Sequence, residues 1–152
     1  MRHATVLLAL LLFSCGGDTE AFVLDFPSQE SFVRSSSAEV FVVPTDDFDA
    51  CAGLVATVIA SDGLAGERST GEQNVCAFRN GGVSVVDAPE GANAFVAVTR
   101  DASGQALLAG CTMRNVYLDD VELHIVLAPT EGYRSTSPST CTVETKCNNS
   151  CR

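Results

Sequence analysis

The chain has little of the material from which many functional sites are built. Of its 152 residues none is Trp, two are His and only nine are Lys or Arg. Two histidines leave little for His-based catalysis or for a His-rich metal site. Nineteen acidic residues give a formal net charge of −10, which excludes the basic surface that nucleic acid requires. The length fits one domain.

The N-terminus carries an apolar stretch of ten residues, 4–13, after a short positive start that contains Arg2. A helix needs roughly 20 residues to span a bilayer, so this stretch is too short to do so. It is typical of the apolar core of a secretory signal. We therefore expect an exported chain whose signal peptide covers residues 1–14.

The end of this stretch, Leu12-Phe13-Ser14-Cys15, resembles the bacterial lipobox. In that family the cysteine is acylated on sulfur, the signal is cut before it, and its amine is acylated too. The resemblance implies that Cys15 is lipidated, although Phe13 is larger than the residues usual at its place. Several acyl chains on one cysteine hold a protein firmly at a membrane. Two alternatives remain: an ordinary cleaved signal, or Cys15 as another core cysteine.

The residue after Cys15 is Gly16 and not Asp, which resembles lipoproteins sorted to the outer membrane. We therefore expect a lipid-anchored protein of the cell envelope, at the outer membrane. The acidic balance opposes contact between the body and an anionic surface. We therefore expect the protein to contact the membrane through its N-terminal lipid anchor and not through the body.

Without Cys15, six cysteines remain, and an exported chain lies in an oxidising compartment where disulfides persist. The disulfide candidates are Cys51, Cys76, Cys111, Cys141, Cys147 and Cys151. Sequence alone leaves all fifteen pairings open. Zinc is disfavoured because no two of these cysteines are separated by only two residues, and His124 is the one histidine after the signal.

Short runs rich in β-branched and aromatic residues predict several strands. Residues 94–99 and 105–112 form a hairpin around a Gly-containing loop. Residues 39–44 predict a core strand, and 75–78 and 83–86 two shorter ones. Residues 21–26 are either an edge strand or a docked part of the tether. The last strand, 121–127, alternates Val121, Leu123, Ile125 and Leu127 inward with Glu122, His124 and Val126 outward.

One short helix is expected after Asp49, its plausible N-cap, with Gly63 as its stop. Its apolar positions recur at helical spacing, at Cys51, Leu54, Val55, Val58 and Ile59. A strand remains the alternative there because several of these residues are β-branched. Residues 28–38 and 63–74 are polar and predict loops.

These patterns divide the chain into four parts. Residues 1–14 are the signal peptide, 15–38 a tether and polar linker, 39–128 a β-sandwich domain, and 129–152 a linker and Cys-rich tail. Residues 141–152 contain almost no apolar side chains, so only disulfides would order them. The expected fold is mostly β: an antiparallel sandwich with one short helix.

Residues 40–127 resemble small lipoprotein domains of myxobacterial and δ-proteobacterial type. They are also similar to the immunoglobulin-like and transthyretin-like sandwiches of carboxypeptidase-regulatory modules. The residues that carry this are 94–101, 102–112 and the strand 121–127. Gly91 is followed by Ala92 and Asn93, so the usual Gly-x-Tyr step is altered.

This resemblance implies the sandwich and a Cys51–Cys111 disulfide. Cys76 would then join the tail, and two tail cysteines would pair with each other. A fold does not imply a function.

No polar cluster forms a recognisable catalytic or metal motif. The acidic turns Asp46-Asp47-Phe48-Asp49 and Asp119-Asp120 with Glu122 lack the spacing and the Gly of a calcium loop. The sequence has no Gly-x-Ser-x-Gly nucleophile elbow with which His124 could form a hydrolase site, so His124 is interpreted as a surface residue. Gly63, Gly66, Gly81 and Gly82 lack the Lys of a phosphate-binding loop and predict turns.

We therefore expect a cell-envelope lipoprotein without enzymatic activity or a cofactor, which acts as a presentation or structural module. The alternative is an envelope module that binds protein or carbohydrate through its loops and Cys-rich tail. An enzyme would require a deep pocket that holds His124 with two carboxylates.

Overall fold

The computed structural model describes residues 20–61, 63–64, 67–79, 83–85, 88–116, 122–135 and 139–151. The expected signal peptide, Cys15, Asp119, Asp120 and Val121 lie outside these residues, as do Gly66, Gly81 and Gly82. Within the described residues the fold is mostly β, with antiparallel sheets, five helices and three disulfides.

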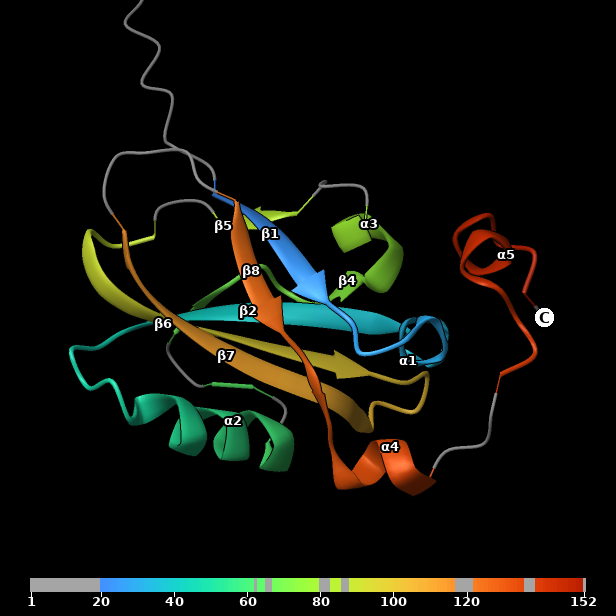
Figure 1. Ribbon diagram of the computed structural model, residues 1–152, viewed down its shortest axis with the longest axis horizontal. Coiled ribbons are helices and arrows are strands. Elements are labelled where there is room, and N and C mark those ends of the chain that lie inside the picture. Colours follow the sequence, from blue (N-terminus) through green and yellow to red (C-terminus); the bar gives the residue numbers. More distant parts are fainter. Residues whose placement is uncertain are drawn as a thin grey trace, which may run out of the picture.

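The strands form two sheets (Figure 1). In the larger sheet the strands follow the order β3 (Arg68–Ser69), β2 (Ser37–Pro44), β6 (Gly91–Arg100), β7 (Ala106–Val116) and β9 (Ala128–Pro129). The short strand β4 (Gln73–Asn74) lies outside this order and pairs with β2. The smaller sheet has the order β5 (Ser84–Val85), β1 (Glu20–Asp25), β8 (Leu123–Val126). Every pairing is antiparallel except that of β1 with β8.

The main core lies between the two sheets. Phe22 and Leu24 of β1 share one buried cluster with Val40 and Val42 of β2 and Phe95 of β6. The rings of Phe22 and Phe95 lie 5.9 Å apart. Residues two apart on one strand face the same side, so alternate residues of β2 and β6 form this layer.

The opposite face of the larger sheet is covered by α2 (Ala50–Ala60), as Figure 1 shows. Phe41, Val96 and Val98 pack there against Val58 of the helix. Since β6 is covered on both faces, residues 93–99 are all buried. This explains why its sequence is a continuous apolar run and does not alternate with polar residues.

Most of the predicted central elements are present. The hairpin is formed by β6 and β7, and both strands are longer than predicted. Its turn is closed by Asp101 Oδ1, which accepts hydrogen bonds from the backbone N–H groups of Ser103 (2.8 Å) and Gln105 (2.9 Å). Burial raises the pKa of Asp101, but a hydrogen bond from the Ser103 hydroxyl (2.6 Å) and those from the backbone N–H groups of the turn outweigh it and leave the pKa below its ordinary value.

On β8, the alternation of the described residues is as predicted. Leu123, Ile125 and Leu127 are buried, and Glu122, His124 and Val126 are exposed. The helix after Asp49 also forms. Asp49 occupies its N-cap without a side-chain hydrogen bond, and the helix ends at Ala60 with Ser61 as its C-cap, two residues before Gly63.

The expectation of one short helix was wrong. Four further helices are present: α1 (Gln29–Arg34), α3 (Val75–Arg79), α4 (Glu131–Ser135) and α5 (Val143–Cys147). The segment 28–38, predicted as a loop, begins α1 because Ser28 and Ser31 form a reciprocal capping box. The predicted strand 75–78 is the helix α3, which buries Val75 and Phe78.

The N-terminal boundary of the folded body also differs from the prediction. Residues 21–26 are predicted as an edge strand or a docked part of the tether, yet β1 lies between β5 and β8 in the smaller sheet. Phe22 is 1% exposed, and Phe22 and Leu24 belong to the main core. Residues 20–38 are therefore part of the body and not of a linker.

Gly110 of β7 allows the chain after β8 to approach closely. A β-carbon at Gly110 would lie 2.1 Å from the Val126 carbonyl oxygen, whereas one at Gly53 in α2 would meet nothing within 4 Å. We expect Gly110→Ala to lower the free energy of unfolding by about 1–3 kcal/mol because backbone must move. Gly53→Ala, the control, should raise it by about 0.5–1 kcal/mol. Urea unfolding of the oxidised protein measures both, and equal effects would contradict this packing.

Candidate functional site beneath the C-terminal tail

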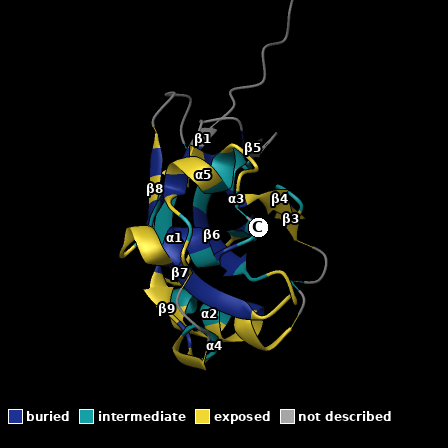
Figure 2. Ribbon diagram, turned by 90° about the vertical axis from the view of Figure 1, so that its right-hand side faces the viewer, coloured by how far each residue is buried: buried dark blue, intermediate teal, exposed yellow. Residues whose placement is uncertain are grey.

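A cavity of about 500 Å³ lies between β1, α1, α3 and α5 and is named here the tail cavity. Figure 2 views the molecule from this side, with α5 above α1 and next to α3. The lining residues are Phe22, Val23, Leu24, Phe26, Ser28, Gln29, Phe32, Phe78, Arg79, Glu122, Val143 and Glu144. Its size is within the range of small-molecule sites.

The floor of the tail cavity is aromatic. Phe22, Phe32 and Phe78 are buried, and Phe26 is half-buried. The rings of Phe26 and Phe32 meet edge to face, with centroids 5.0 Å apart. These side chains come from β1, α1, α3 and the β1–α1 turn, so the cavity exists only once these elements are packed.

The tail forms one wall of the cavity. Val143 of α5 is 9% exposed and packs with Phe32, Val33 and Val75. The Cys76–Cys147 disulfide joins α3 to α5, and Cys141–Cys151 closes the tail on itself. Lys146 Nζ donates a hydrogen bond to the Val33 carbonyl oxygen at 2.8 Å, and burial lowers the pKa of Lys146.

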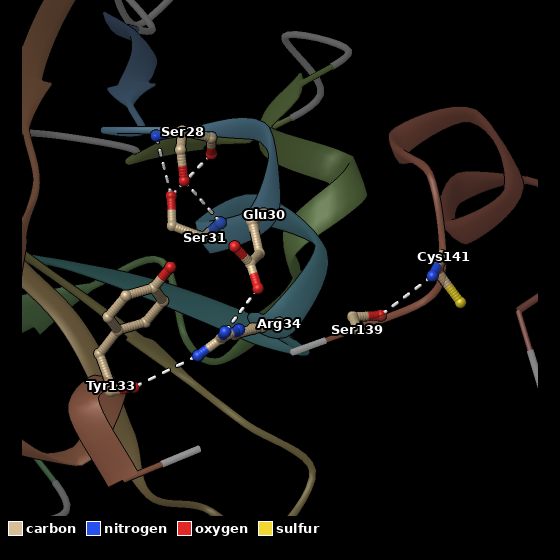
Figure 3. Close-up of polar contacts among 7 residues, drawn as sticks. All are labelled: Ser28, Glu30, Ser31, Arg34, Tyr133, Ser139 and Cys141. Atoms are coloured by element: carbon tan, nitrogen blue, oxygen red, sulfur yellow. Dashed lines mark hydrogen bonds and ion pairs between the residues drawn. The ribbon is translucent and has the colours of Figure 1, made fainter. Parts of the chain in front are cut away.

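The opposite wall, α1, is held at both ends (Figure 3). At its start, Ser28 and Ser31 cap each other's backbone N–H groups at 3.1 Å. At its end, Arg34 pairs with Glu30, donates to the Tyr133 carbonyl oxygen at 3.4 Å, and lies 4.7 Å from the centre of the Tyr133 ring. These contacts join α1 to α4 and fix the position of Phe32.

Three charged side chains line the rim. Arg79 lies 3.9 Å from Glu144, and Glu122 lies at the start of β8. The pKa of Glu144 is held below its ordinary value by its own backbone N–H, by the Thr142 hydroxyl and by Arg79. Two carboxylates and one guanidinium leave the rim with an excess of negative charge.

His124 meets two carboxylates, but not in a pocket. Its Nδ1 lies 3.1 Å from Asp25 Oδ2, and its Nε2 lies 3.8 Å from Glu122 Oε2. The His124 side chain is 56% exposed and is not among the cavity-lining residues. His124 is therefore an exposed residue beside two carboxylates, as its outward position on the predicted strand indicates.

The acidic turn before α2 is an exposed turn. Asp47 Oδ1 accepts a hydrogen bond from the Asp49 backbone N–H at 2.9 Å, and both residues are exposed. Within the described part of the chain, no group of three or more His, Cys, Asp or Glu side chains could hold a metal ion.

The six cysteines form three disulfides: Cys51–Cys111, Cys76–Cys147 and Cys141–Cys151. The resemblance implies Cys51–Cys111 and a bond from Cys76 to the tail; the structure gives Cys147 as the tail partner. Sequence reasoning missed the tail cavity itself. Two features of the sequence could have indicated the helices that line it. Ser28 and Ser31 form a capping box at the start of α1, and Thr142 takes part in a second capping box at the start of α5.

Comparison of the chain with family models, curated proteins and solved structures finds no match. In the described residues, no helix has the length and apolar character needed to cross a membrane.

Proposed function

We propose that the chain is a lipoprotein of the cell envelope, anchored at the outer membrane by acyl chains on Cys15, whose body is a non-catalytic structural or presenting module. One observation supports this most directly. Each cysteine within the described residues is in a disulfide, which suits an oxidising, exported environment. Cys15 follows an apolar leader and is left over from this set.

The body is proposed to be an immunoglobulin-like or transthyretin-like sandwich. Two sheets that share one core support this proposal. The parallel pairing of β1 with β8 and the helix α2 over the outer face are departures from a purely antiparallel sandwich.

Replacing the anchoring residue tests the lipoprotein proposal. We expect Cys15→Ala to move the protein from the membrane fraction to the soluble fraction and to remove the mass of the acyl chains, because the proposed attachment is through acyl chains on Cys15. Ser14→Ala is the control: it keeps a small residue before Cys15 and should stay membrane-bound. A Cys15→Ala chain that remains in the membrane with unchanged mass would contradict lipidation.

The tail cavity favours a second candidate function, an envelope binding module in which the tail takes part in recognition. A cavity of about 500 Å³ with an aromatic floor and a polar rim can hold a small ligand, a sugar unit or a side chain of a protein partner. The tail supplies Val143 and Glu144 to this site, which gives the Cys-rich tail a binding role beyond its own closure.

A neutral apolar probe tests this binding role. We expect 4-phenylbutanol to shift the NMR signals of Phe26 and Val143. The double variant Cys76→Ser/Cys147→Ser should weaken its binding severalfold because α5 is no longer bonded to α3. The double variant Cys141→Ser/Cys151→Ser keeps that bond and should bind nearly as the parent does. No shift in the parent would contradict a binding role for the cavity.

A further inference from the structure

We propose that the tail cavity selects an organic cation with an apolar body, such as an amine or quaternary ammonium group carried by a hydrocarbon or an aromatic ring. This inference deepens the binding role proposed for the cavity and depends on it. It follows from the separation of the apolar floor from the charged rim.

The floor determines the body of the ligand. The side chains of Phe22, Phe32, Phe78 and Val143 offer almost only carbon, so a buried polar group would lose its hydrogen bonds to water without replacement. An apolar or aromatic group of a ligand therefore occupies the floor. Its polar group must lie at the rim, where Ser28 and Gln29 are exposed to water.

The rim determines the sign of the charge. Arg79 is near Glu144, at 3.9 Å, so its charge is already largely balanced. The Glu122 carboxylate forms no ion pair with a Lys or Arg of the described residues, and His124 Nε2 lies 3.8 Å from it. The Arg114 guanidinium is also near, but it donates to the Glu122 backbone carbonyl oxygen, at 3.4 Å. A cation at the rim would be attracted by Glu122, whereas a carboxylate there would be repelled.

Two further effects act in the same direction. The faces of phenyl rings carry negative potential, so a cation above Phe26 gains a cation–π interaction. The chain's net charge of −10 also raises the local concentration of cations over that of anions.

Three probes that share one body test this inference: 4-phenylbutylamine, 4-phenylbutanol and 4-phenylbutyrate. The full chain carrying Cys15→Ala is used, so that no acyl chain enters the cavity, and affinities are measured by NMR titration at low salt. We expect the amine to bind about threefold to fivefold more tightly than the alcohol, in line with a single exposed charge pair. The carboxylate should bind more weakly than the alcohol.

Glu122→Gln should reduce the amine's advantage over the alcohol to about twofold or less, as expected when one exposed charge pair is lost. Glu131→Gln, on α4 and outside the cavity lining, is the matched control and should leave the advantage unchanged. Equal affinities of amine and alcohol, or an advantage that survives Glu122→Gln, would overturn the cation inference while the binding role stands. Failure of all three probes to bind would contradict the binding role as well.

Discussion

The covalent bond between Cys76 and Cys147 is the constraint on which the candidate site depends. The tail buries one apolar side chain, Val143. Burial of a valine contributes about 1.5–3 kcal/mol. Ordering the backbone costs about 1–2 kcal/mol for each residue, so burial alone cannot hold residues 139–151 against the body. The disulfide offsets part of that cost, about 2–4 kcal/mol, by restricting the unfolded chain.

This constraint connects location to structure. A tail held by disulfides persists only where the compartment is oxidising. The apolar leader and Cys15 predict such a location independently of the tail. The proposed export and the tail cavity are thus connected, because the wall formed by α5 depends on a disulfide that an oxidising compartment preserves.

The central elements could be predicted because their signals are local. The alternation of Leu123 with His124 and the apolar run of β6 follow from the side-chain period of a strand. The helix α2 follows from its three-and-four spacing. The parallel pairing of β1 with β8 could not be predicted, because it joins residues about one hundred positions apart and has no turn to indicate it.

The candidate site was missed for a related reason. Ser28 and Thr142 look like loop residues by composition, although each caps a short helix through its hydroxyl group. Phe26, Phe78 and Val143 come from three separate segments and meet only in the folded chain. The resemblance implied Cys51–Cys111 and a bond from Cys76 to the tail but not which tail cysteine takes part, and spacing alone leaves fifteen pairings open.

The most direct test of this account is a peptide map of the oxidised protein, digested without reduction. It should contain three cross-linked species that join Cys51 to Cys111, Cys76 to Cys147, and Cys141 to Cys151. A peptide that joins Cys51 to Cys76 would contradict the account, because Cys76 could then not bond to Cys147 and α5 would not be joined to α3 beside the tail cavity.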